Sequence, residues 1–317
     1  MEPLLRVRDL YVDYKLPHSG LLPAVRGVDF DIAPGESVGV LGESGCGKST
    51  LAAAIPRLLP VSDVILRGSV IFRGRELTAL ADHELRSLRG AEIEFIHQEP
   101  ALALNPVLRV ERQVADVARA HGCGGAAGHG ARAVLEQVGL PMPRASHAYP
   151  HQLSGGQRQR VVIAQALVCR PALVIADEPT SSLDSTTQAE ILGLLGRLRS
   201  QTRIALLLIS HDPAVLGALC DRVLVMYAGQ IVEQGPLREV YCRPLHPYTK
   251  ALLSLLDGEA RRRALPCITG IPPDPMQLPP GCAFEPRCPE SKALCQSREP
   301  QQIQQGGRRV RCFNYGG

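Results

Sequence analysis

The sequence predicts an α/β fold with a mostly parallel sheet, and three observations carry that prediction. Apolar β-rich runs at Ser37–Leu41, Leu173–Ala176 and Ala205–Ile209 are separated by helical patterns, as in βαβ units. A glycine-rich turn joins the first of these runs to a helix. The second run ends in two carboxylates, at the strand end where open α/β sheets bind ligands.

The N-terminal part of the chain predicts short strands before that turn and a helix after it. The strand patterns are Leu4–Val12 and Val28–Ile32. The helix is expected over Ser49–Leu59, but Pro56 should kink it or end it early because the proline ring removes a backbone donor.

Helical patterns dominate from about residue 92 to residue 169, as in Ala131–Val138 and Arg158–Val168. Within this stretch Gly122–Gly128 is expected to be a flexible loop. Further along, Val223–Tyr227 predicts a strand, and Ala228-Gly229 predicts a hairpin turn before another short strand.

Composition excludes several classes of protein. The chain has 317 residues, about two domains' worth, and 45% of them are hydrophobic, which is enough for a sizeable core. Its 35 basic and 31 acidic residues leave a net charge of only +4, far from a nucleic-acid-binding tail. Apolar runs such as Ile204–Ile209 are much shorter than the roughly 18 residues of a membrane span. The N-terminus lacks a secretory signal pattern, so we expect a cytosolic, soluble chain.

The composition changes after about Gly235, where prolines become frequent. We therefore expect a nucleotide-binding domain over residues 1–235, with a helical subdomain inserted at about 95–168. Residues 236–317 are expected to be an appended module, with residues 271–280 as an extended linker.

A phosphate-binding loop is predicted between the strand at Ser37–Leu41 and the helix that follows. Its sequence satisfies G-x-x-x-x-G-K-[ST], and the strand-turn-helix context is the one that this motif requires. The glycines allow successive backbone N–H groups to point inward at an anion. Lys48 would reach the β- and γ-phosphates, and the Ser49 hydroxyl would bind Mg²⁺. The nucleotide-binding residues expected here are Gly42, Glu43, Ser44, Gly45, Cys46, Gly47, Lys48, Ser49 and Thr50.

Two acidic residues end the strand at Leu173–Ala176. Asp177 is expected to hold Mg²⁺, and Glu178 to accept a proton from an attacking water molecule. An apolar run followed by Asp-Glu is common by itself, but together with the phosphate loop it indicates a nucleotide hydrolase.

A second phosphate-binding surface is predicted where Ser154, Gly155, Gly156 and Gln157 begin an arginine-rich helix. The alternative is an ordinary serine N-cap with a glycine turn. One chain cannot easily wrap both loops around one nucleotide. We therefore expect a head-to-tail dimer in which each serine loop completes the other subunit's site.

With these motifs in this order, residues from about Leu4 to Gly235 resemble the ATP-binding cassette family. The resemblance implies a RecA-like core with antiparallel β and α-helical subdomains. Tyr14 resembles the aromatic residue that stacks on adenine, with Tyr11 as its rival. Gln98 resembles the loop glutamine that touches Mg²⁺ and water and reports nucleotide occupancy to a membrane partner.

The resemblance extends to two further segments and implies a mechanism. Asp184, in Ser182-Leu183-Asp184, resembles the loop that crosses the dimer interface, and His211 resembles the histidine that contacts the γ-phosphate. Water would attack the γ-phosphate of ATP in line while Lys48, Mg²⁺ and the partner subunit's Ser154 spread the developing charge. Glu178 would polarise that water, so we expect a competent ATPase.

The C-terminal module resembles the extension found on ATP-binding subunits of bacterial dipeptide/oligopeptide and nickel importers. Leu245–Leu253, Gly270–Pro273, Pro280–Phe284 and Arg287–Pro289 carry this resemblance, which covers about residues 244–313. It implies an ATPase subunit that powers import of dipeptides or oligopeptides. A nickel or metal-chelate importer of the same family is the alternative.

Four of the ten cysteines cluster in this module, as Cys282, Cys288, Cys295 and Cys312. Four thiolates suit tetrahedral Zn²⁺ or an iron–sulfur cluster, but no C-x2-C pair is present, and unligated thiols are a third option. The family resemblance implies a [4Fe–4S] cluster. In a chain without a secretory signal we expect reduced thiols or metal ligands rather than disulfides. Packed small hydrophobic side chains are expected at Cys46, Cys123, Cys169, Cys220, Cys242 and Cys267.

The family implies specific partners and a location. These are a second cassette subunit, identical or homologous, two integral-membrane permease subunits contacted near Gln98–Asn105, and an extracytoplasmic substrate-binding protein, with no nucleic acid. The chain would lie peripherally on the cytoplasmic face of the plasma membrane. Two readings from other classes are a non-transport ATPase of repair or translation, and an iron–sulfur redox sensor. Cargo, dimer composition and the hydrolysing site are left open by the sequence.

Overall fold

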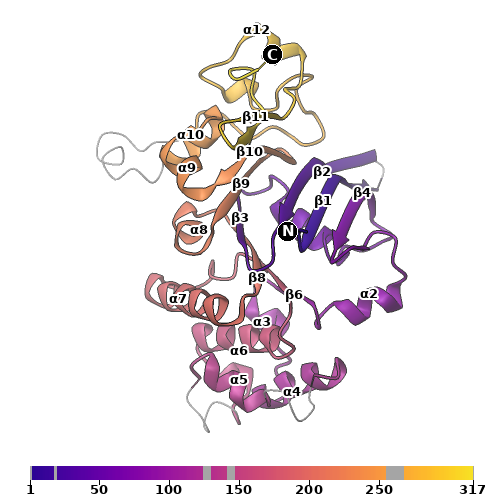
Figure 1. Ribbon diagram of the computed structural model, residues 1–317, viewed down its shortest axis with the longest axis vertical. Coiled ribbons are helices and arrows are strands. Elements are labelled where there is room, and N and C mark those ends of the chain that lie inside the picture. The colour runs from indigo at the N-terminus through magenta and orange to yellow at the C-terminus, as the bar shows by residue number, and fades with distance from the viewer. Residues whose placement is uncertain (1, 18–19, 124–129, 141–146, 255–267, 317) are drawn as a thin grey trace. The chain divides into compact units, whose positions relative to one another are not determined.

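The computed structural model describes residues 2–17, 20–123, 130–140, 147–254 and 268–316 (Figure 1). The chain forms two compact units. Unit 1 comprises Met1–Ile32, Ser37–Thr78 and Ile209–Gly317, and unit 2 comprises Ala33–Glu36 and Ala79–Leu208.

Unit 1 contains an antiparallel sheet with the strand order β2-β1-β4-β5. Its strands are β1 (Leu5–Leu16), β2 (Gly20–Ile32), β4 (Val64–Phe72) and β5 (Arg75–Glu76). Apolar residues of β1, such as Leu5, Val7 and Leu10, are fully buried, and alternate residues are more exposed, as expected for a sheet with one face on a core. The predicted N-terminal strand is confirmed and is longer than its apolar run.

Unit 1 also contains a parallel strand pair and a hairpin that share one strand. Strand β3 (Ser37–Leu41) pairs in parallel with β9 (Arg222–Tyr227), and β9 pairs antiparallel with β10 (Gln230–Pro236). The turn between β9 and β10 is the predicted Ala228-Gly229, where both residues have positive φ (46° and 81°). The C-terminal module adds β12 (Arg308–Val310) to β10, followed by β11 (Ile303–Gln305).

The helices of unit 1 are short. Helix α1 (Lys48–Ala54) ends two residues before Pro56. This is expected because the proline ring removes a backbone donor and restricts the preceding residue. The others are α8 (Pro213–Leu219), α9 (Leu237–Cys242), α10 (Pro247–Ser254) and α12 (Ala293–Ser297), with a 3-10 turn, η2, at Glu285–Arg287. Residues 271–280 form neither helix nor strand.

Unit 2 combines a parallel strand pair with the predicted helical region. Strand β6 (Ile93–Ile96) pairs in parallel with β7 (Leu173–Asp177). Helices α3, α4 and α5 each contact α6, and the four lie together in Figure 1. The helical elements of the unit are α2 (Asp82–Leu88), α3 (Pro100–Ala103), α4 (Val110–Ala120), α5 (Ala131–Gln137), the 3-10 turn η1 (Pro150–Gln152), α6 (Gly155–Leu167) and α7 (Ser185–Thr202). Strand β8 (Ala205–Ser210) carries the chain from unit 2 into unit 1.

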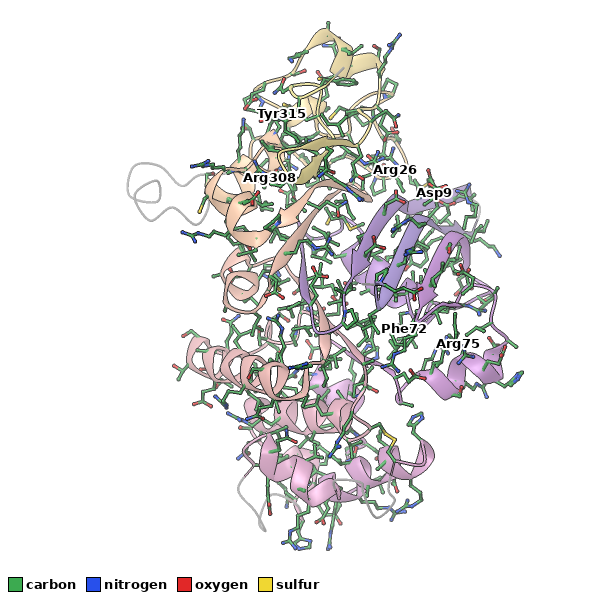
Figure 2. The ribbon with its side chains drawn as sticks, in the orientation of Figure 1. Asp9, Arg26, Phe72, Arg75, Arg308 and Tyr315 are labelled. Carbon is green, nitrogen blue, oxygen red and sulfur yellow. A yellow bond between two sulfur atoms is a disulfide. The ribbon has the colours of Figure 1, made fainter. Side chains whose placement is uncertain are left out.

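A disulfide joins Cys123 to Cys169 in unit 2, drawn as a yellow bond in Figure 2. The expectation of packed thiols without disulfides is therefore wrong for these two residues. Their Cα atoms lie 5.4 Å apart, within the range that a disulfide requires. They are 46 residues apart in the sequence, just beyond the ends of α4 and α6, so spacing gave no sign of the pair. Most of the predicted loop at Gly122–Gly128, and Cys267, lie outside the described residues.

No helix in the described part of the chain is both long enough and apolar enough to span a bilayer. The longest is α7, with 18 residues, and it includes Glu190, Arg197 and Arg199.

The ionisation of Glu94, on β6, makes the free energy of unfolding depend on pH. Burial raises the pKa of its carboxyl to about 7, and among the described residues its Oε2 has no hydrogen-bond partner. The folded chain therefore retains a proton that the unfolded chain releases near pH 4.5. Since folding then binds a proton, the free energy of unfolding falls as the pH rises from about 4.5 to 7.

We predict that Glu94→Gln removes this term, because glutamine does not ionise. The melting temperature of the variant should exceed that of the wild type by a few degrees at pH 8, and the difference should shrink towards pH 4.5. Exposed Glu136 on α5 is the matched control, and Glu136→Gln should leave the pH profile unchanged. Parallel profiles for Glu94→Gln and wild type would contradict the assignment.

Candidate ATP-binding and hydrolysis site

The predicted phosphate loop connects β3 to α1 in unit 1, and steric constraints fix its shape. Gly47 is the N-cap residue of α1 and has φ 102°, in the region that favours glycine. A Cβ atom there would lie 2.2 Å from the carbonyl oxygen of Ala24. A Cβ at Gly42 would lie 2.3 Å from the carbonyl oxygen of Met226. The loop is therefore held against β2 and β9 at positions where side chains do not fit.

Lys48 is buried beside this loop. Its Nζ donates hydrogen bonds to the carbonyl oxygens of Gly42 and Glu43, each at 2.9 Å. The Cys46 thiol lies 3.9 Å from the same ammonium group, but burial is the larger influence and raises the pKa of the thiol. The loop thus holds the Lys48 ammonium group through its own backbone carbonyl oxygens.

Two residues of the C-terminal module contact the loop, and sequence reasoning did not assign either of them. Arg287 donates to both carboxylate oxygens of Glu43, at 2.7 and 3.0 Å. The Tyr248 hydroxyl accepts a hydrogen bond from the Glu43 backbone N–H at 2.9 Å. The only sequence signal for Arg287 was its place beside Cys288 in the resemblance to importer extensions.

The two candidate tyrosines, Tyr14 and Tyr11, have different surroundings. The Tyr14 hydroxyl lies 3.2 Å from the Thr50 hydroxyl on α1. The Tyr11 ring is instead covered by the Arg67 guanidinium, 4.9 Å from the ring centroid. His211 is exposed and directly follows β8, two residues before α8 begins, at the strand end predicted for it.

In unit 2, Ser181 links the backbone that follows β7 to the predicted glutamine. Asp177 is buried at the end of β7, and Glu178 follows it with φ 46°. The Ser181 hydroxyl donates to the Glu178 carbonyl oxygen at 3.1 Å, and Gln98 Nε2 donates to Ser181 Oγ at 3.3 Å. A left-handed conformation at a residue other than glycine is costly, and such outliers gather at functional sites. Sequence reasoning missed Ser181, although it lies three residues after Glu178.

The predicted serine loop lies at the start of α6, and the Ser154 side chain caps this helix. Ser154 Oγ accepts from the Gln157 N–H at 3.3 Å, and Gln157 Oε1 accepts from the Ser154 N–H at 3.0 Å. A Cβ at Gly156 would lie 2.4 Å from Cγ2 of Thr187, so the loop packs closely on the start of α7. Asp184 caps α7 by accepting from the Thr187 N–H at 3.0 Å. The serine N-cap of the alternative interpretation is thus observed.

The four clustered cysteines of the C-terminal module line one small cavity, together with His246 and Phe284 among others. Burial is the main cause that raises the pKa of Cys282, to about 11, and neighbouring thiols raise it further. Burial also raises the pKa of Cys288 and Cys312. In the described part of the chain, no group of three or more His, Cys, Asp or Glu side chains is arranged to hold a single metal ion.

Comparison with known proteins identifies the family. Residues 25–181 match the family described as ABC transporter, and residues 232–295 match the one described as oligopeptide/dipeptide transporter, C-terminal region. A putative peptide import ATP-binding protein of Brucella abortus (strain 2308) is 44% identical over 98% of this chain and 94% of its own length. The chain belongs to the ABC transporter family.

Other ABC transporter proteins support the same assignment. The oligopeptide transport ATP-binding protein OppD of Escherichia coli (strain K12) is 42% identical, over 98% of this chain and 93% of its own. The dipeptide transport ATP-binding protein DppD of Bacillus subtilis (strain 168) is also 42% identical, over 99% and 95%. The solved dimer of the cassette MJ0796, bound to ADP and Pi, has a TM-score of 0.65 and 30% identity, covering 74% of this chain and 99% of its own. The predicted cassette fold is confirmed, and ATP hydrolysis is the activity of this family.

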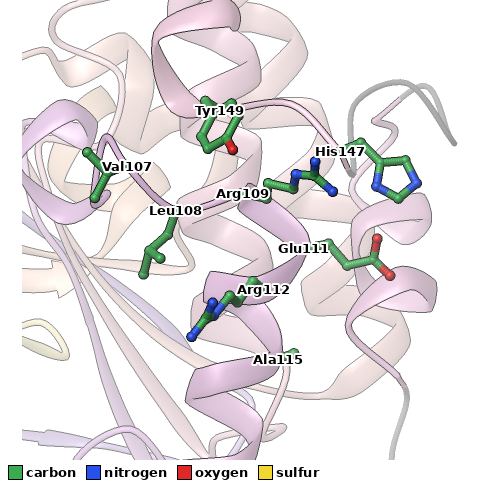
Figure 3. A pocket seen from close by; sticks show the side chains of 8 residues that line it. All are labelled: Val107, Leu108, Arg109, Glu111, Arg112, Ala115, His147 and Tyr149. Carbon is green, nitrogen blue, oxygen red and sulfur yellow. The ribbon is translucent and has the colours of Figure 1, made fainter.

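The ABC transporter cassette also presents a cavity of about 500 Å³ in unit 2, on its helical region (Figure 3). Val107 and Leu108 give it apolar walls at the start of α4, and Arg109 and Arg112 add positive charge. Leu102, on α3 in the same unit, is 86% exposed. The residues lining the cavity are Val107, Leu108, Arg109, Glu111, Arg112, Ala115, His147 and Tyr149.

Proposed function

We propose that this chain is the ATP-hydrolysing subunit that powers a dipeptide/oligopeptide importer through a separate membrane permease. The observation that carries the proposal is the joint presence of a phosphate-loop cassette and the transporter-type C-terminal region. Relatives that match along nearly the whole chain are named peptide import or peptide transport proteins. A nickel or metal-chelate cargo is the second candidate. The shared C-terminal region argues against a repair or translation ATPase and against a pure redox sensor.

We propose that the chain's own residues divide the work of hydrolysis between them. The phosphate loop binds the triphosphate of ATP through its N–H groups and Lys48, and Tyr14 stacks on the base. Glu178 accepts a proton from the attacking water, while His211 and Gln98 fix the geometry of the water and the γ-phosphate. The remaining loop residues, Glu43, Ser44 and Cys46 among them, shape the binding surface.

The chain offers the oxygen donors that Mg²⁺ prefers: the Ser49 hydroxyl, the Asp177 carboxylate and the Gln98 amide. These three residues would hold the ion. When bound, Mg²⁺ neutralises charge on the β- and γ-phosphate oxygens.

We propose that two cassettes form a head-to-tail dimer, in which the partner subunit's Ser154 loop covers the γ-phosphate and Asp184 lies at the subunit interface. The position of Ser154 at the start of α6 supports this, because helix N-termini favour anions. The related MJ0796 cassette is described as dimeric. The proposed nucleotide-binding domain covers residues 1–235, with residues 236–317 as its extension.

We propose that the cavity in Figure 3 receives a cytoplasmic helix of one of two permease subunits. Its apolar walls and the exposed Leu102 and Val107 suit an amphipathic helix. This places the chain at the cytoplasmic face of the plasma membrane, with an extracytoplasmic binding protein delivering cargo to the permease.

We propose that the four-cysteine cavity holds a [4Fe–4S] cluster, as the resemblance of this module to importer extensions implies. All four cysteines line one cavity. Four thiolates are a ligand set that such a cluster takes. Zinc remains the alternative. Cluster ligands would be Cys282, Cys288, Cys295 and Cys312.

We predict that Glu178→Gln preserves ATP binding but slows turnover by about 10²–10⁴-fold, the usual scale for loss of a general base. Nucleotide affinity and phosphate release would be measured with the subunit assembled on its permease, with peptide and Ni²⁺ cargo compared for stimulation. Glu136→Gln is the matched control and should behave as wild type. Unchanged phosphate release from Glu178→Gln would refute the role of this carboxylate.

We predict that Val107→Glu prevents co-purification of the chain with its permease, because a buried carboxylate would face the docked helix. Val107 is 74% exposed, so the isolated subunit should remain folded. Val61 is 70% exposed in unit 1 and provides the matched control, Val61→Glu. Equal co-purification of both variants would exclude this surface as the docking site.

We predict that anaerobically purified protein contains iron and sulfide and absorbs near about 400 nm. Cys288→Ser should lose most of the iron, because one of four ligands is removed. The control Cys242→Ser changes an exposed cysteine outside the cavity and should keep the iron. Colourless protein loaded with zinc would overturn the cluster and support the alternative.

A further inference from the structure

An acidic residue in the phosphate loop is neutralised by the C-terminal module. Arg287 forms a two-pronged ion pair with Glu43, and its side chain is only 3% exposed. Such bidentate pairs fix direction as well as charge. Both partners lie in unit 1, 244 residues apart in the sequence.

Arg287 makes further hydrogen bonds besides those to Glu43, and these fix the position of its guanidinium group. Its guanidinium also donates to the Tyr227 hydroxyl at 3.3 Å. Its Nε donates to the carbonyl oxygen of Thr269 at 3.1 Å, and Nη2 donates to that of Ile268 at 3.4 Å.

The negative charge of Glu43 makes its ion pair with Arg287 relevant to nucleotide binding. A carboxylate in a loop that binds a triphosphate opposes the incoming anion unless a cation compensates it. Arg287 supplies that compensation and holds the carboxylate in one direction. The Glu43 N–H is committed to Tyr248 rather than to phosphate, which fixes the backbone at the same residue.

The same contact joins the phosphate loop to the cysteine cavity. Arg287 directly precedes Cys288. Phe284 lines the cavity and packs against Tyr227 and Tyr248, with ring centroids 5.2 and 5.4 Å away. One continuous set of contacts therefore runs from Glu43 through three aromatic rings to the thiols.

We propose that Arg287 is a positioning residue for ATP binding, acting through Glu43, and that the C-terminal module is thereby a working part of the nucleotide site. The proposal rests on the ATPase activity of the chain and adds to it a residue outside the cassette motifs.

The test is a double-variant cycle on the full-length protein, with the dissociation constant of a hydrolysis-resistant ATP analogue measured in the presence of Mg²⁺. Arg287→Met should weaken binding by about tenfold or more, because it leaves the Glu43 charge uncompensated. Adding Glu43→Gln should restore affinity to within about threefold of wild type, because the opposing charge is then gone. Exposed Arg309→Met, in the same module, is the control and should not change affinity.

A general loosening of the module would not be repaired by a second substitution in the loop. Equal affinities for Arg287→Met and Arg309→Met would overturn the proposal, as would a double variant that binds no better than Arg287→Met. If the wild type itself fails to bind the analogue, the proposed function fails instead. The two failures are therefore distinguishable.

A second measurement covers the case in which Arg287→Met does not fold. Arg287→Lys keeps the charge but loses the two-pronged geometry. The ATP analogue should bind Arg287→Lys at least about threefold more weakly than the wild type, and Arg309→Lys should bind as the wild type does. Equal affinities for the wild type and Arg287→Lys would contradict the role of the two-pronged geometry.

Discussion

The tight seating of the phosphate loop is the constraint on which the rest of the site depends. The loop has no room for side chains where Gly42 and Gly47 meet neighbouring carbonyl groups. Those carbonyls belong to β2 and β9, so the shape of the loop depends on both the antiparallel sheet and the parallel strand pair. The turn after β9 also contributes, because the Gly229 N–H donates to the Cys46 carbonyl oxygen at 3.0 Å. Close contacts between backbone segments of unit 1 thus determine the conformation of the phosphate loop.

The C-terminal module is built into unit 1 by the same kind of contact. Strand β12 extends the β9–β10 ladder, and Arg308 from β12 pairs with the fully buried carboxylate of Glu233. That carboxylate also accepts from the backbone N–H groups of Leu245 and His246. A buried charge needs several such partners. The segment that begins α10 is therefore held at a defined place, and Tyr248 reaches the phosphate loop from there.

Much of the fold and site could be predicted from the sequence, because local patterns carried the information. The strand before Gly42 and the strand ending at Asp177 are short apolar runs bounded by turn residues, and both were found where expected. The helix after the loop ends as Pro56 requires. In each case neighbouring residues in the sequence determine the structure.

The features that sequence reasoning missed are long-range. The Cys123–Cys169 disulfide joins residues whose spacing matches no motif. Arg287 and Glu43 are paired only because β9, β10 and the module bring them together. The Arg67 guanidinium covers the Tyr11 ring from another strand. Such contacts depend on the folded sheet, and a motif cannot encode them.

The ion pair between Glu43 and Arg287 has a consequence for how these chains evolve. We expect Glu43 and Arg287 to be inherited together, because the loss of Glu43 leaves a guanidinium that is only 3% exposed without its counter-charge. If only the C-terminal modules of two related cassettes were exchanged, the hybrid should work when both parents carry the same ion pair at the positions of Glu43 and Arg287. A lineage that loses its tail should accordingly carry a neutral residue at the position of Glu43.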